Sequence, residues 1–191
     1  MSSSYAYLVL ILWAVWVLYW IVSARNVKTT RQSESLSSRS AHLFPILAAA
    51  ALILAPPFPA GKFLFNRFAP SSIVVCWSGC MLVFAGLGVS CWARLHLGRN
   101  WSSRVTVKEG HELIRSGPYA LIRHPIYTGM LCAIAGTALV ENQWRALLAL
   151  LLMGFSFWRK LRVEERLMAL TFPGAYRDYC ARTAALIPFV L

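Results

Sequence analysis

Charged residues are scarce in this chain, and acidic residues are the scarcest. Only 14% of the 191 residues are charged, and 7 acids stand against 19 lysines and arginines. A soluble domain carries about 25% charged residues, whereas 58% of this sequence is hydrophobic and its mean hydropathy is +0.57. There is too little polar surface to cover a soluble domain, so the composition predicts an integral membrane protein.

Patterns for metals and disulfides are also missing. The five cysteines contain no CxxC pair, and most of them lie in apolar stretches, where we expect small buried hydrophobic side chains. The four histidines show no metal-ligand spacing. We therefore expect neither a metal site nor a disulfide framework. The net charge of +12 would suggest nucleic acid in a soluble protein. In a membrane protein it indicates basic cytoplasmic loops against anionic lipid headgroups, so we expect no nucleic-acid partner.

Apolar runs separated by polar segments predict an all-α polytopic fold with about five transmembrane helices. The first run is rich in aromatic residues and has no basic residue before it, which argues against a signal peptide. The third carries Gly79, Gly86 and Gly88, where neighbouring helices could approach closely. The fifth continues without a helix breaker to Met168, which predicts one long helix that leaves the membrane. The runs are 5–22, 42–55, 71–97, 125–140 and 144–157.

The placement of charge predicts an orientation for these helices. If the five runs span in order, the loops 24–41 and 94–124 and the tail from 158 lie on one side. They hold all of the 19 lysines and arginines except Lys62, Arg67 and Arg145. Lys and Arg are enriched in cytoplasmic loops. We therefore predict an external N-terminus, a cytoplasmic C-terminus, and polar chemistry at the cytoplasmic face.

Two polar clusters on that side are candidates for a ligand site. The segment 117–129 packs two glycines, two prolines, two tyrosines, Arg123 and His124 in front of an apolar run. Its glycines permit close backbone approach and its aromatic rings offer stacking faces. In the second cluster, Arg162 and Glu165 share a helix face. A solvated loop with interfacial aromatics, and a helix end of mixed charge, are the alternative interpretations.

Together the two clusters resemble a known family. The similarity covers roughly Leu97 to the C-terminus and is to the isoprenylcysteine carboxyl methyltransferases, with the related phospholipid N-methyltransferases sharing the Arg-His-Pro core. The chain departs from the usual pattern at Met168, where leucine is common, and at Pro173, where glycine is common. The matching residues are His111-x-Leu113-x-x-x-Gly117-x-Tyr119-x-x-x-Arg123-His124-Pro125-x-Tyr127-x-Gly129, then Glu164-Glu165-x-x-Met168 and Tyr176-x-x-Tyr179.

The resemblance implies a membrane-embedded enzyme that uses S-adenosylmethionine, and releases S-adenosylhomocysteine, without a Rossmann domain. The absence of a G-x-G-x-x-G motif agrees with this. The apolar runs and the start of the resemblance near Leu97 together predict two regions. These are an N-terminal three-helix transmembrane region over 1–97 and a C-terminal catalytic region over 98–191. The cofactor-binding residues that the resemblance implies are His111, Leu113, Ile114, Gly117, Tyr119, Arg123, His124, Pro125, Tyr127, Glu164 and Glu165.

The nature of the methyl acceptor determines which further groups are needed. A carboxylate is already a nucleophile at neutral pH and needs only a cation to position it, for which Arg94 is the first candidate and Arg162 the second. An amine must first lose a proton, for which Glu165 or His124 could serve. We favour a lipophilic carboxylate, entering sideways from the bilayer, over a phospholipid or other lipophilic amine. An NADPH-dependent membrane reductase of the sterol type and a non-catalytic membrane scaffold are the remaining alternatives.

Overall fold

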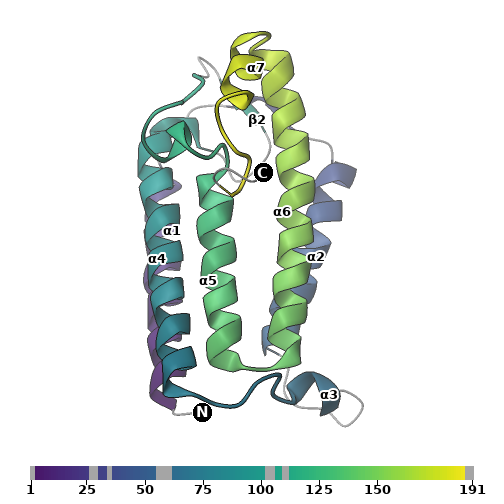
Figure 1. The fold of residues 1–191 in the computed structure, drawn as a ribbon. Coiled ribbons are helices and arrows are strands. Elements are labelled where there is room, and N and C mark those ends of the chain that lie inside the picture. The colour runs from purple at the N-terminus through teal and green to yellow at the C-terminus, as the bar shows by residue number, and fades with distance from the viewer. Residues whose placement is uncertain are drawn as a thin grey trace.

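The computed structural model describes residues 3–25, 30–33, 36–54, 62–101, 106–108 and 112–187, and helices dominate it (Figure 1). Each of the five predicted apolar runs forms one long helix. The predicted extension of the last run is confirmed, because its helix has 28 residues. The long helices are α1 (Ser3–Ser23), α2 (Leu36–Leu54), α4 (Ile73–Leu97), α5 (Pro125–Glu141) and α6 (Trp144–Thr171), and the short ones are α3 (Lys62–Phe65), α7 (Ala175–Cys180) and the 3-10 turns η2 (Gly98–Asn100) and η3 (Gly117–Ala120).

Two local features differ from the sequence-based prediction. α2 begins at Leu36, inside the polar stretch that was assigned to a loop. A contact from α6 anchors this first part of α2, since Arg159 Nη1 donates to the carbonyl oxygen of Ser38 at 2.9 Å. In addition, β1 (Thr30–Ser33) pairs antiparallel with β2 (Thr106–Lys108). The all-α class is confirmed for the bundle, to which this short ribbon is an addition.

The closest contact between helices in the bundle joins α4 to α5 through two pairs of glycines. A Cβ on Gly86 would lie 2.4 Å from the carbonyl oxygen of Gly129, and a Cβ on Gly136 would lie 2.5 Å from that of Gly79. Small residues at these positions let two helix backbones touch. Close approach is thus confirmed for Gly79 and Gly86. Gly88 is instead exposed, and a Cβ on it would meet nothing within 4 Å.

The two N-terminal helices flank this central pair. α1 packs against α4, while α2 packs against α6 (Figure 1). Buried indole N–H groups need a hydrogen-bond partner. Two tryptophans of α1 find such partners on the central pair of helices. Trp13 Nε1 donates to Thr137 Oγ1 at 3.0 Å, and Trp16 Nε1 donates to Ser90 Oγ at 2.7 Å. The segments 1–97 and 98–191 therefore share one helix bundle, and their division into two regions stays a prediction.

Among the described helices, two are long and apolar enough to cross a membrane by length and composition. They are Ser4–Ser23 and Ile73–Asn100, with mean hydropathies of 2.1 and 2.0. Leu43–Leu54 and Pro125–Glu141 are apolar but shorter. The number of five membrane-spanning helices therefore stays a prediction.

One end of the bundle carries most of the irregular structure. β2, η3 and α7 gather there, and α6 extends beyond α5 to contact α7, at the top of Figure 1. The N-terminus lies at the opposite end. Both polar clusters identified in the sequence therefore lie at the same end of the bundle.

Candidate functional site

The segment 117–129 enters α5 through a tightly turned loop. Gly117 has a φ of +60°, and a Cβ there would lie 2.7 Å from the ring of His96. Both the backbone conformation and the lack of space require glycine. Pro125 is fully buried at the start of α5, where proline is well suited because its missing N–H would have no helical partner. Arg123 and His124 are thereby presented just outside the helix.

A segment after α7, residues 181–187, holds this loop in place, and we call it the C-terminal strap. The Arg123 N–H donates to the carbonyl oxygen of Ala184 at 2.8 Å. The His124 N–H donates to that of Ala185 at 3.1 Å. Main-chain hydrogen bonds thus fix the backbone of both polar residues.

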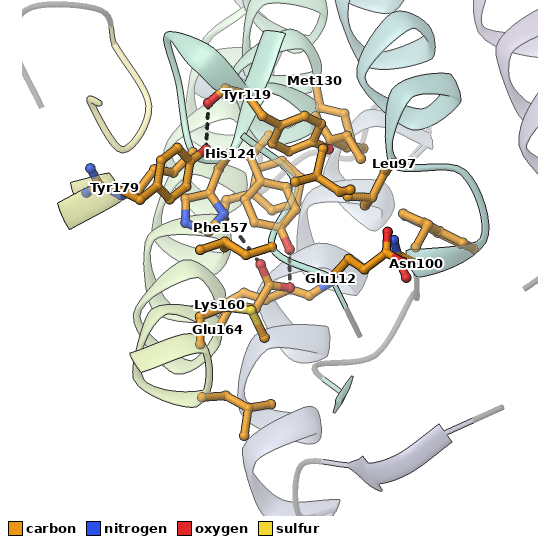
Figure 2. A pocket seen from close by; sticks show the side chains of 18 of the residues that line it. Leu97, Asn100, Glu112, Tyr119, His124, Met130, Phe157, Lys160, Glu164 and Tyr179 are labelled. Atoms are coloured by element: carbon orange, nitrogen blue, oxygen red, sulfur yellow. Dashed lines mark hydrogen bonds and ion pairs between the residues drawn. The ribbon is translucent and has the colours of Figure 1, made fainter. Parts of the chain in front are cut away.

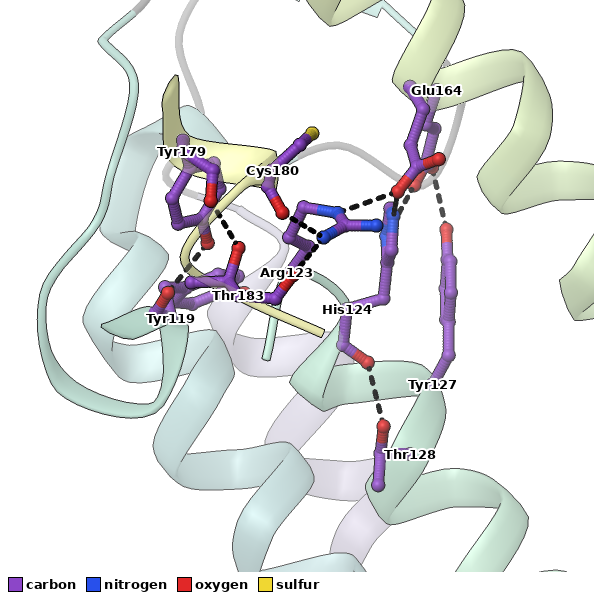
Figure 3. Close-up of polar contacts among 10 residues, drawn as sticks. Tyr119, Arg123, His124, Tyr127, Thr128, Glu164, Tyr179, Cys180 and Thr183 are labelled. Carbon is purple, nitrogen blue, oxygen red and sulfur yellow. Dashed lines mark hydrogen bonds and ion pairs between the residues drawn. The ribbon is translucent and has the colours of Figure 1, made fainter. Parts of the chain in front are cut away.

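The side chains at the start of α5 and in the outer part of α6 form a polar network (Figure 3). Arg123 Nε donates to Glu165 Oε1 at 2.8 Å, and the Tyr127 hydroxyl donates to Glu164 Oε1 at 2.6 Å. The His124 ring lies between the carboxylates, with Nδ1 3.5 Å from Glu164 and Nε2 3.4 Å from Glu165. This ring also stacks on Tyr127, with 5.5 Å between centroids.

Charge pairing sets the protonation of this network. Burial disfavours the charged ring of His124, but the two neighbouring carboxylates outweigh burial and raise its pKa above 6.5. Burial also opposes ionisation of Glu165, yet His124 and Arg123 lower the pKa of its carboxyl from 4.5 to about 2. Against the same effect of burial, His124, Lys160 and Tyr127 lower the pKa of Glu164. The arrangement therefore favours an imidazolium between two carboxylates at neutral pH.

The same network is tied to the tail of the chain. The Arg123 guanidinium donates to the carbonyl oxygens of Thr183 and Cys180, the latter at 3.4 Å. The buried Tyr179 hydroxyl donates to the carbonyl oxygen of Tyr119 at 2.6 Å. Burial raises the pKa of Tyr179 to about 12, so its phenol remains a protonated donor. α6, the loop and the strap therefore form one connected wall.

A cavity of about 330 Å³ lies against this wall (Figure 2). Polar groups of the network meet aromatic and aliphatic side chains from α1, α5 and α6 around it. A concave, mostly apolar pocket with a few convergent polar groups is the usual form of a small-molecule site. Of the residues that the sequence predicts, Leu113, Ile114, Tyr119, Arg123, His124, Tyr127 and Glu164 line this cavity.

The other predicted residues lie away from the cavity lining. Gly117 and Pro125 shape the loop, as described above. Glu165 and Arg162 line a second hollow on the outer side of α6. His111 lies outside the described residues. The structure thus brings the loop and the glutamate pair together while directing Glu164 and Glu165 to different sides.

Arg94 is buried and makes structural contacts. Its Nη1 donates to the carbonyl oxygen of Gly98 at 2.7 Å, and its Nη2 to that of Ser23 at 2.6 Å. The guanidinium also lies over the ring of Trp101, 4.5 Å from the centroid. Arg94 therefore joins α1 to the end of α4, next to the cavity and not on its lining. Among the described residues, no group of His, Cys, Asp and Glu is arranged to hold a metal ion.

Sequence reasoning missed several residues of the cavity wall. Trp16 and Trp20 reach it from α1 and stack with 4.5 Å between centroids. Their spacing of four places them on one helix face, which is a signal that could have indicated a shared role. Lys160 and Asn100 also line the cavity. Among the described residues, the buried side-chain oxygen of Asn100 has no hydrogen-bond partner.

The chain matches one family model and is similar to several curated proteins. The model of the isoprenylcysteine carboxyl methyltransferase (ICMT) family matches residues 78–170. The cobalt-zinc-cadmium resistance protein CzcN of Cupriavidus metallidurans is 33% identical over 116 residues, which cover 59% of this chain and 51% of that protein. Protein-S-isoprenylcysteine O-methyltransferase of Saccharomyces cerevisiae is 29% identical over 157 residues, which cover 81% of this chain and 64% of that protein. The chain thus spans between about half and two thirds of the length of these relatives.

A solved structure shows the same fold. The eukaryotic intramembrane Ras methyltransferase ICMT matches with a TM-score of 0.55 and 22% identity, over 81% of this chain and 64% of that one. The region matched by the family model contains both the Arg123-His124-Pro125 turn and the Glu164-Glu165 pair. The chain is therefore similar to the isoprenylcysteine carboxyl methyltransferase family over residues 78–170, and it shares the fold of an integral membrane protein.

Proposed function

We propose that this protein transfers a methyl group from S-adenosylmethionine to the carboxylate of a lipophilic acceptor. The observation that carries the proposal is the cavity in which an aromatic and aliphatic wall meets the network of Tyr127, His124 and Glu164. The match to the family model supports the methyl donor. The name of the yeast relative supports an acceptor that joins an isoprenoid to a carboxylate. We therefore assign the methyl acceptor of this chain to the same chemical class, a lipophilic carboxylic acid.

The residues of the cavity fit the cofactor. The buried side-chain oxygen of Asn100, which has no partner among the described residues, can accept an N–H, and S-adenosylmethionine carries amino groups at both ends. The Glu164 carboxylate and the ring of Tyr119 suit the positive charge of a sulfonium. When bound, this cofactor supplies an electrophilic methyl group. The cavity volume of about 330 Å³ is at the low end for ligand sites. Because the cofactor takes up this space, we place the apolar body of the acceptor outside the cavity, in the bilayer.

The chain must position the acceptor carboxylate and exclude water, because an ionised carboxylate needs no general base. We assign the positioning to Lys160, since it lines the cavity whereas Arg94 and Arg162 do not. Its Nζ lies 5.4 Å from the centroid of the Tyr127 ring, so the cation is held beside the polar network. Arg123 also lines the cavity and binds Glu165 and the tail, and Lys160 lowers the pKa of Glu164, so both cations belong to the same network.

The charge state of the network favours a carboxylate acceptor over an amine. An amine requires a general base whose pKa lies near the working pH. The two carboxylates raise the pKa of His124 and so favour its protonated form over the free base, and Glu165, with a pKa of about 2, is a weak base. Both bases considered for the amine are therefore poorly suited. This protonation pattern supports O-methylation.

We further propose that the cavity faces the cytosol. The basic loops and the tail after α6 lie at the cavity end of the bundle, and the N-terminus lies at the other end. An excess of Lys and Arg is typical of cytoplasmic segments. The water-soluble cofactor would then enter from the cytosol, while the acceptor enters from the bilayer.

A methyl-transfer assay tests the proposal. The full chain, in lipid nanodiscs, receives S-adenosylmethionine with a labelled methyl group and either a prenylated cysteine with a free carboxylate or the matched carboxamide. We expect label in the acid alone. Lys160→Met should raise KM for the acid at least tenfold, while Lys62→Met, at the other end of the bundle, should leave it unchanged. Calorimetric binding of NADPH without binding of S-adenosylhomocysteine would instead support the reductase.

A further inference from the structure

A basic hollow lies on the outer side of α6, behind the wall of the cavity. Its volume is about 390 Å³, and three exposed arginines line it, Arg162 and Arg166 from α6 and Arg177 from α7. Among the described residues of its lining, Glu165 is the one acid, and its carboxylate accepts a hydrogen bond from Arg123. The hollow therefore presents a concentrated positive charge to the surroundings of the protein.

The hollow continues an apolar stripe along α6. Leu151 is 70% exposed, and Phe155 and Trp158 are each 53% exposed. Exposed Arg162 and Arg166 follow at the same spacing of three to four residues, which places all five on one helix face. In an integral membrane protein, an exposed apolar stripe of this kind faces lipid, and tryptophan marks the boundary of the bilayer.

The depth of the arginines matches the headgroup layer. At 1.5 Å per residue, Arg162 lies about 6 Å beyond Trp158 along the helix, and Arg166 about 12 Å. The polar layer on each side of a bilayer is roughly 5 to 8 Å thick. Arg162 therefore falls within that layer if Trp158 marks its inner boundary, and Arg166 lies beyond it, from where its long side chain can reach back.

We propose that this hollow binds the headgroup of an anionic phospholipid whose acyl chains lie along the α6 stripe. A guanidinium donates two parallel hydrogen bonds to phosphate oxygens, which favours arginine at such sites. A soluble phosphate would use the arginines but would leave Phe155 and Trp158 without contact, whereas a lipid uses both parts of the face. Glycerophospholipids with a net negative headgroup are therefore the ligand class.

The hollow and the cavity share a wall. Tyr176 lines both, and Glu165 reaches from the hollow to Arg123. A headgroup in the hollow thus stabilises the junction of α6 with α7 from outside. Lipid binding is measured directly, so its failure would leave the proposed methyl transfer untouched, and a failed methyl transfer would leave the lipid site untouched.

Native mass spectrometry of the full chain in detergent tests this site. The protein is titrated with phosphatidylglycerol or phosphatidylcholine, and the affinity of the first retained lipid is measured. We expect tighter binding of phosphatidylglycerol. Each basic residue near anionic lipid contributes about fivefold, so R162Q/R166Q should weaken that binding roughly 25-fold and R177Q about fivefold. R162K/R166K should lose less affinity than R162Q/R166Q, because the charge stays while the paired hydrogen bonds of the guanidinium are lost.

The matched control makes the same change of charge at the other end of the bundle, as K62Q/R67Q, and should bind phosphatidylglycerol like the wild type. Unchanged affinity in both R162Q/R166Q and R177Q would overturn the proposal. Displacement of the lipid by excess inorganic phosphate would also overturn it, because the hollow would then be a site for a soluble anion. Equal melting temperatures of the variants show that the measured losses are not due to unfolding.

Discussion

Replacing Glu165 by glutamine removes one charge from the network that joins α6 to the loop before α5. Burial would raise the pKa of this carboxyl, but His124 and Arg123 lower it from 4.5 to about 2. At roughly 1.4 kcal/mol per pH unit, this difference corresponds to a stabilisation of about 3 kcal/mol by the ionised form. Glutamine keeps the shape of the side chain without its charge. We therefore expect Glu165→Gln to lower the free energy of unfolding by about 3 kcal/mol at pH 7.

The size of this loss should depend on pH in a defined direction. Because the pKa of Glu165 is lower in the folded state, its stabilisation is complete above the unfolded-state pKa of 4.5 and is lost as the pH falls through about 2. The wild type and the variant should thus differ most near neutral pH and converge between about pH 4.5 and 2. Denaturant unfolding of the protein in detergent, followed by tryptophan fluorescence, measures the difference.

Asp178→Asn is the matched control, since Asp178 is an exposed carboxylate on α7. An exposed substitution usually changes stability by less than about 0.5 kcal/mol. A loss of that small size in Glu165→Gln would refute the assigned role of the ion pair. The role would also be refuted if the difference in the free energy of unfolding between the variant and the wild type stayed constant on acidification. The stabilisation would then not depend on the charge of the carboxylate.

Three further predictions address the bundle and the cavity. Gly86→Ala should lower the free energy of unfolding by about 1 to 3 kcal/mol in a chemical unfolding experiment. The reason is that the new Cβ would lie 2.4 Å from a carbonyl oxygen of α5. Gly88→Ala is the control and should not destabilise the protein, because its Cβ would meet nothing within 4 Å. Tyr127→Phe loses its hydrogen bond to Glu164 and should weaken S-adenosylhomocysteine binding about tenfold by calorimetry. The ion pairs of His124 should stabilise the protein fully below about pH 6.5 and be lost as the pH rises through its raised folded-state pKa. His124→Gln should remove this alkaline loss in melting curves.

The five long helices could be predicted because a helix in lipid must satisfy its own backbone and be apolar along its length. Their pairing could not. Gly79 and Gly86 indicate that a helix can be approached closely, but they do not indicate that α5 is the neighbour. The loose alternation over 101–107 predicts an extended segment, which agrees with β2, but nothing in the sequence indicates that it pairs with β1.

The site was predictable where residue types are constrained by a shared motif, as for His124, Tyr127 and Glu164, which meet at one wall of the cavity. Arg94 was chosen for its place at the end of a helix. Its contacts with carbonyl oxygens depend on where α1 ends in space, and nothing near Arg94 in the sequence indicates that. The contribution of Trp20 likewise depends on the packing of α1 against α4.

The C-terminal strap has a consequence for how the protein is made. The strap follows all five long helices in chain order, yet it supplies the carbonyl oxygens that hold Arg123 and His124. Every long helix is therefore synthesised before the loop in front of α5 has its partners. A nonsense mutation just after α7 would yield a chain with all five long helices and an unfinished cavity wall. Such a product would pass a test of membrane insertion and fail a test of ligand binding.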